Sequence, residues 1–154
     1  MNYGVIGNCQ IAALIDEQGR YVWGCLPRPD GDPVFSSLLQ KEGGDARTGV
    51  FAVDMVDLTR SEQCYLRNSA ILETRLFDSH GGVVRIVDFA PRFRTRGRVF
   101  RPMMFVRSVE PLAGRPTLKL RLRPTSGFGE RAPPGVAGSH HIKFAADGIQ
   151  YRMT

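Results

Sequence analysis

The chain has 154 residues, of which 42% are hydrophobic and 23% are charged, a balance typical of one folded globular domain and unlike that of a disordered or fibrous chain. A net charge of +6 leaves nucleic acid, an acidic surface or an acidic domain open as partners, although a solvated basic surface is the simpler interpretation. Cys9, Cys25 and Cys64 form no CxxC or His/Cys cluster, so no zinc site or other cofactor is expected. Cys9 and Cys25 lie in apolar runs and are predicted to be buried free thiols.

The N-terminus shows no targeting pattern. Met1 leads directly into NYGVIGNCQI, without a charged region followed by a long apolar region. No run approaches the ~18 apolar residues of a membrane span. These features predict a cytoplasmic chain, or a piece of a longer protein whose targeting signal lies elsewhere.

The first third predicts one hairpin and one helix. Residues 9–15 and 21–26 are apolar strand candidates around a polar turn that ends in Gly19. Asp32 and Pro33 have the character of a helix start, so a short amphipathic helix is expected near 33–41, ended by Gly43 and Gly44.

From Thr48 onward the pattern is β throughout, with prolines 111 and 116 bounding a turn and Asp147 with Gly148 forming another. Leu118, Leu120 and Leu122 alternate with basic residues and are predicted to face inward. The last strand leaves an unpaired edge, through which the chain is expected to self-associate. The strand candidates are residues 50–56, 62–67, 70–77, 83–89, 103–109, 117–123, 141–145 and 149–153.

The segment 65–92 predicts the central hairpin. A two-residue loop at Gly81 and Gly82 would place Arg75 opposite Asp88 and Asp78 opposite Arg85, two favourable charge pairs. A loop at His80 and Gly81 would instead oppose Glu73 and Asp88, which repel unless they share a proton. Charge therefore favours the first register.

Glu73 and Asp88 are the one carboxylate pair that the strand pattern brings close, as glycoside hydrolysis would require. We favour a structural role, with the two acids paired to Arg75 and Arg85. His80, His140 and His141 are interpreted as surface residues rather than metal ligands. His140 and His141 are adjacent, and adjacent strand residues point to opposite faces, so they rarely bind one ion together. No catalytic residue and no metal ligand is assigned.

Two further stretches are candidates for binding. The arginine-rich run 91–101, with Phe93 and Phe100, has the composition of a nucleic-acid patch, but it lacks a recognisable binding fold, so no nucleic-acid partner is expected. Trp23 with Arg28 and Asp30 is the best candidate for sugar contact, since an aromatic face and charged planar groups suit a pyranose. A core role for Trp23 is the simpler interpretation.

Four blocks, in order, resemble a known family over nearly the whole chain. They are residues 3–8 with 12–14; residues 23–28 with Asp30 and Phe35; residues 71–74 with 88–92; and residues 107–114 leading to 123–124 and 127–129. Their order and spacing are similar to the N-terminal trehalase-like β-sandwich domain of bacterial glycoside hydrolase family 15, the glucoamylase and trehalase group. The chain departs from the family at Asn8 (usually Asp), Pro29 (Phe), Gly31 (Ser) and near Ser69 and Ala70 (Thr-Asn).

The resemblance implies an all-β antiparallel sandwich over residues 1–154, supersandwich-like and incomplete. In the family an (α/α)6 barrel follows and carries both catalytic glutamates of an inverting hydrolysis of α-glucosides. The chain ends before such a barrel, so it is expected to be inactive alone and to have the catalytic domain of its parent protein as partner. A free-standing carbohydrate-binding module is the alternative, with trehalose or an α-glucan as ligand.

Overall fold

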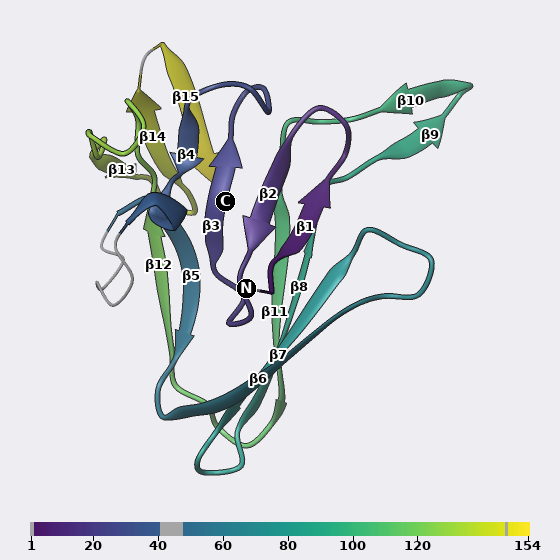
Figure 1. Cartoon of the computed structure of the whole chain (residues 1–154), viewed down its shortest axis with the longest axis vertical. Helices are drawn as coiled ribbons and strands as arrows, with labels where there is room; N and C mark the ends of the chain where they lie inside the picture. The colour runs from purple at the N-terminus through teal and green to yellow at the C-terminus, as the bar shows by residue number, and fades with distance from the viewer. Residues whose placement is uncertain (1, 41–47, 147) are drawn as a thin grey trace.

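The computed structural model describes residues 2–40, 48–146 and 148–154, and over these residues the fold is all-β, as the sequence predicts (Figure 1). Its only helical turn there is the 3-10 helix η1, Ser37–Leu39. The strands are β1 Gly4–Gly7, β2 Ala12–Ile15, β3 Tyr21–Cys25, β4 Pro33–Phe35, β5 Val50–Met55, β6 Leu58–Tyr65, β7 Leu72–Asp78, β8 Val83–Phe89, β9 Phe93–Thr95, β10 Arg98–Phe100, β11 Val106–Ala113, β12 Leu118–Arg123, β13 Gly135–Ala137, β14 Ile142–Ala146 and β15 Ile149–Met153.

Two antiparallel sheets carry most of the chain. The first has the order β1-β2-β3-β5-β12, with β4 added on β3, and the second has the order β11-β8-β7-β6. Strands β13, β14 and β15 make a small third sheet, and β9 with β10 makes a two-stranded arm that projects beyond the main sheets (Figure 1). No helix of the described residues is long and apolar enough to cross a bilayer.

The core lies between the two main sheets because their strands alternate apolar and polar residues. β8 shows the pattern clearly, with Val84, Ile86 and Asp88 buried and the residues between them half-exposed. One core cluster joins Val53 and Met55 of the first sheet to residues of the second. The other surrounds Tyr21, whose ring stacks on those of Phe51 at 5.4 Å and Phe35 at 5.5 Å. Offset aromatic stacking adds stability beyond the area buried.

The predicted first hairpin is confirmed, although its first strand begins at Ala12 rather than residue 9. Asp16 shapes its turn, since its Oδ1 accepts hydrogen bonds from the backbone N–H of Gln18 and Arg20. Gly19 supplies the positive φ, 76°. Cys25 is buried as predicted, but Cys9 is exposed, with φ at 70°, because it lies in the bend before β2.

The predicted register of the central hairpin is wrong. Leu72 opposes Asp88, and Arg75 opposes Arg85, so neither expected charge pair forms. The loop is longer than two residues because the Asp78 side chain organises it, accepting hydrogen bonds from the N–H of His80 at 2.8 Å and Gly82 at 2.7 Å. A three-residue loop with a left-handed glycine, here Gly81 at 82°, competes with the two-residue type in hairpins.

The helix expected near 33–41 is largely replaced by β4. Val34 and Phe35 are 3% and 6% exposed, and extended backbone lets β4 pair with β3 while both side chains are buried. Only η1 falls within the predicted helix. Residue 41 and the predicted helix end at Gly43 and Gly44 lie outside the described residues, as does residue 147 of the predicted last turn.

The strand after the arm is displaced from its predicted position. β11 begins at Val106 and runs through Pro111, where a turn was expected. Proline is tolerated there because β11 is an edge strand, and the pairing shifts register between Pro111 and Ala113. Leu120 of β12 shares the face of Leu118 and Leu122, yet it is 54% exposed because β12 is also an edge strand.

Candidate functional site

A buried ion pair within the second sheet faces the first sheet. Arg107 of β11 donates to Asp88 of β8 through Nε at 2.8 Å and Nη2 at 3.0 Å, and the Tyr21 hydroxyl donates to the same carboxylate at 3.0 Å. The Arg107 and Asp88 side chains are 4% and 0% exposed. The guanidinium also lies over the rings of Tyr21 at 4.4 Å and Phe51 at 4.6 Å. Burial, and then the charge of Asp88, raise the pKa of Tyr21 well above its ordinary value.

Glu73 is held separately, on the outer face of the second sheet. Its two carboxylate oxygens accept from Arg75 Nε and Arg85 Nε, each at 2.7 Å. Burial alone would raise the pKa of Glu73, but the hydrogen bonds from Arg85 and Arg75 outweigh it and hold that pKa below its ordinary value. The predicted partners of Glu73 are thus confirmed, whereas Asp88 pairs with Arg107 instead.

Glu73 and Asp88 cannot act together on one substrate. Glu73 opposes Val87 in the ladder, so it and Asp88 project from opposite faces of the sheet. Both carboxylates are also saturated by arginine donors. This pair is therefore scaffold.

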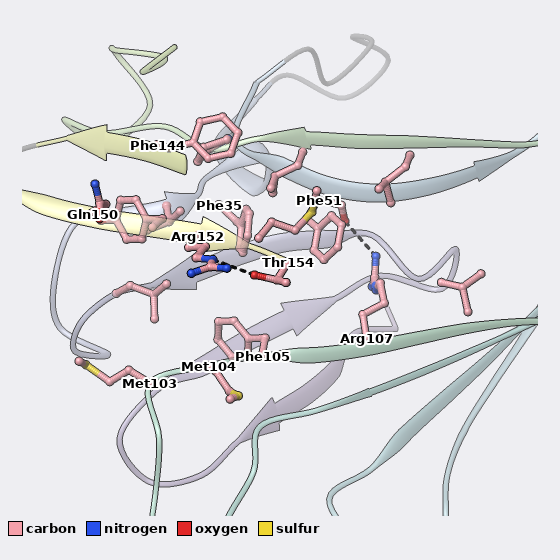
Figure 2. A pocket seen from close by; sticks show the side chains of 18 residues that line it. Phe35, Phe51, Met103, Met104, Phe105, Arg107, Phe144, Gln150, Arg152 and Thr154 are labelled. Carbon is pink, nitrogen blue, oxygen red and sulfur yellow. Dashed lines mark hydrogen bonds between the residues drawn. The ribbon is translucent and has the colours of Figure 1, made fainter. Parts of the chain in front are cut away.

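An open crevice of about 540 Å³ lies between the sheets beside the Asp88–Arg107 ion pair (Figure 2). Figure 2 shows Phe35, Phe51 and Phe105 around it, with Arg107 at one end and Met103 and Met104 toward the other. Its described lining contains no Asp, Glu, His or Cys. The crevice can hold apolar groups, and its described lining offers no carboxylate, imidazole or thiol side chain.

The structure pairs two of the three predicted sugar-contact residues and leaves Trp23, among the described residues, without a hydrogen bond or ring contact to either. Trp23 is half-buried on β3, opposite Leu14 and outside both core clusters. Arg28 and Asp30 lie in the next loop and bind each other, with Arg28 Nε to Asp30 Oδ1 at 3.0 Å and Nη2 to Oδ2 at 2.8 Å. The hydrogen bond from Arg28 lowers the pKa of Asp30. In the described part of the chain, no hydrogen bond, ion pair or ring contact joins Trp23 to this pair.

A second loop meets the first through Asp32. The Asp32 carboxylate accepts hydrogen bonds from the N–H of Gly127 at 2.6 Å and Phe128 at 2.7 Å. Phe128 is 67% exposed. We name residues 26–32 and 125–131 the loop pair. The sequence alone suggested no role for Phe128. The one signal that it offers there is an aromatic residue between two glycines, Gly127 and Gly129.

Of the remaining candidates, His80 and His140 are exposed, whereas His141 is half-buried rather than at the surface as expected. His80 Nε2 is 3.4 Å from Asp57 Oδ2, and the rings of His140 and His141 meet edge to face at 5.2 Å rather than pointing apart as expected. The described residues contain no group of three side chains that could hold a metal ion. On the arm, Phe93 and Phe100 stack at 5.6 Å, and both strands are exposed.

Comparison with known proteins gives one family. A model described as trehalase-like, N-terminal, matches residues 2–131. A trehalase of Thermoplasma volcanium is 30% identical over 147 residues, covering 94% of this chain and 23% of the trehalase. A trehalase of Mycolicibacterium smegmatis is 34% identical over 87 residues, covering 56% of this chain and 12% of the trehalase. The chain thus spans less than a quarter of these relatives, and no solved structure matches it.

Proposed function

The chain belongs to the trehalase-like N-terminal domain family, and from this premise we propose that it is a non-catalytic domain of an α-glucoside hydrolase of family 15 type. Its role is to pack on the catalytic domain of the parent protein and support it. The relatives named trehalase carry the matching segment within much longer polypeptides, which supports this role. The substrate class, the inverting mechanism, the (α/α)6 barrel and the cytoplasmic location are parts of the same proposal.

One observation carries the non-catalytic assignment. Glycoside hydrolysis needs two carboxyl groups that face one bond, at about 5–10 Å. The pair that the strand pattern singled out, Glu73 and Asp88, projects from opposite faces of the sheet and is neutralised by arginines. The buried acids of the described chain thus serve the fold.

The purified 154-residue chain is expected to release no glucose from trehalose, maltose or starch oligosaccharides. The physical reason is the absence, among the described residues, of a facing pair of unengaged buried carboxylates. Glucose is measured with a coupled assay, and a chain carrying Glu73→Gln serves as a contamination control. Turnover that survives repurification and is lost in the Glu73 variant would overturn the proposal.

A carbohydrate-binding module is the second candidate, and the exposed Arg28–Asp30 pair beside β3 favours it. Titration with trehalose and malto-oligosaccharides should then produce a saturable change in Trp23 fluorescence. Asp30→Asn should weaken that binding, because it breaks the bidentate pair that orients Arg28. Fluorescence that stays constant up to millimolar sugar argues against this candidate.

Self-association is expected from the edges of the sheets. The last strand, β15, is an edge strand of the third sheet, and β11 and β12 are edge strands of the main sheets. Val109 of β11 and Leu120 of β12 are 38% and 54% exposed. An unpaired edge strand with exposed apolar side chains is a template for pairing with a strand of another chain. Sedimentation velocity should show oligomers that grow with concentration, and Leu120→Lys should reduce them. A wild-type chain that stays monomeric at high concentration refutes this expectation.

A further inference from the structure

Phe128 is the most exposed aromatic side chain of the described residues, at 67%. It stands at the apex of a turn in the loop pair, away from both core clusters. Complete burial of a phenylalanine side chain stabilises a protein by about 1.5–3 kcal/mol, and the described fold gains little of this free energy from Phe128. An aromatic side chain held out in this way is typical of a contact residue.

The backbone around Phe128 is held in an unfavourable conformation. Gly127, Phe128 and Gly129 have φ angles of 63°, 56° and 97°. Glycine adopts these angles freely, but a residue with a side chain pays about 1–2 kcal/mol in the left-handed region. The two hydrogen bonds to Asp32 hold this conformation from the neighbouring loop. The fold therefore fixes the direction in which the Cα–Cβ bond of Phe128 points.

The base of the turn is packed as firmly as a core. Ser36 and Thr125 are 2% and 1% exposed, and their hydroxyl groups are hydrogen-bonded at 2.8 Å. The Thr125 N–H donates to the Val34 carbonyl at 2.9 Å, which ties the loop to β4. A Cβ atom at Gly129 would lie 3.1 Å from Ser36 Oγ. Phe128 therefore stands on a rigid base, and little entropy is lost when such a side chain binds.

We propose that Phe128 is the anchor by which this domain docks on the catalytic domain of its parent protein, with the ring inserted into an apolar pocket there. This inference rests on the proposed function. Aromatic anchors of this kind dominate the binding energy of protein interfaces. Two of the charged groups near Phe128 are already engaged, Arg28 with Asp30 and Asp32 with the backbone N–H groups of the turn. The trehalases of Thermoplasma volcanium and Mycolicibacterium smegmatis devote 77% and 88% of their lengths to sequence outside the matched segment (100 − 23 and 100 − 12).

Hydroxyl-radical footprinting of the 154-residue chain and of the complete parent protein tests the anchor directly. Oxidation of Phe128 should fall at least about fivefold in the parent, whereas Phe93, which is 52% exposed on the arm, is the reference of the same residue type. Equal oxidation of Phe128 in both proteins, with protection elsewhere, overturns the anchor and leaves the proposed function standing. A footprint that is identical everywhere overturns the packing role as well. Protection of Phe128 by trehalose in the chain alone would make it a sugar contact instead.

A pair of variants separates docking from folding. Phe128→Ala should lower the unfolding midpoint of the parent protein and leave that of the isolated chain unchanged, because the ring touches little of its own domain. Val136→Ala is the matched control, since Val136 is also 67% exposed but lies on β13, and it should change neither midpoint. An equal loss in the parent and the isolated chain for Phe128→Ala would show a merely structural role and overturn the anchor.

Discussion

Asp88→Asn is expected to lower the free energy of unfolding by about 3–5 kcal/mol. This is the typical loss when one charge of a buried ion pair is removed and the other stays buried. The Arg107 guanidinium would stay 4% exposed without a counter-charge. Its hydrogen bonds to the Phe51 and Gly19 carbonyls orient it but cannot neutralise it. Denaturant unfolding followed by circular dichroism measures the loss.

Asp30→Asn is the matched control for this experiment. Asp30 forms an ion pair of the same bidentate geometry with Arg28, but its side chain is 69% exposed. Water screens such a pair, so no measurable change is expected. If Asp88→Asn does not fold, the double variant Asp88→Leu with Arg107→Met decides the case, since removing both charges should recover folding. Equal midpoints for the two single variants would contradict a stabilising role for the Asp88–Arg107 pair.

Asn8→Asp is expected to lower the free energy of unfolding by about 3 kcal/mol. The Asn8 amide nitrogen donates to the carbonyls of Pro91 at 3.0 Å and Pro102 at 2.9 Å, while its oxygen accepts from the N–H of Gln10 and Ile11. A carboxylate keeps the two accepted bonds but turns a second oxygen toward two carbonyl oxygens, in a site that is 2% exposed. Unsatisfied buried groups cost about 1–3 kcal/mol, and charged ones more.

A thermal melt measures the Asn8 effect, which should be a fall in midpoint of roughly 6–12 °C for a domain of this size. Asn68→Asp is the control, because Asn68 is exposed in a turn with φ at 55°, a conformation that Asp also accepts. Equal melting of the two variants would show that the donors of Asn8 are dispensable. The result also bears on the departure from the family at this position, since the amide of Asn8 fits the two carbonyls that surround it.

The hairpins show how far local pattern reaches. The first was predictable because Asp16 and Gly19 act within their own turn, and local chemistry alone sets that geometry. The register predicted for the central hairpin was wrong because it considered only the two strands of the hairpin, and so it paired Arg75 with Asp88. In the structure the partner of Asp88 comes from β11, and the turn is set by the side chain of Asp78. Cross-strand charge preferences of a few tenths to about 1 kcal/mol do not outweigh a buried bidentate ion pair and an organised loop.

The contacts of the candidate site also divide into local ones, which the sequence could predict, and distant ones, which it could not. Arg28 and Asp30 are two residues apart in a short loop, so their proximity could be predicted from sequence. The contact between Asp32 and the Gly127 and Phe128 amides spans more than ninety residues and could not, because no short-range periodicity encodes it.

Local sequence patterns specify the class of the protein: an all-β chain whose ordered motifs belong to the trehalase-like N-terminal family, with hairpins where polar turns separate apolar runs. Which charges meet depends on tertiary packing. It buried Asp88 with Arg107 between the sheets, placed Glu73 on the opposite face, and set Phe128 outward on a loop held by Asp32. The physical reason is that strand alternation specifies which face a side chain occupies, whereas its partner depends on how distant strands and loops are packed against that face.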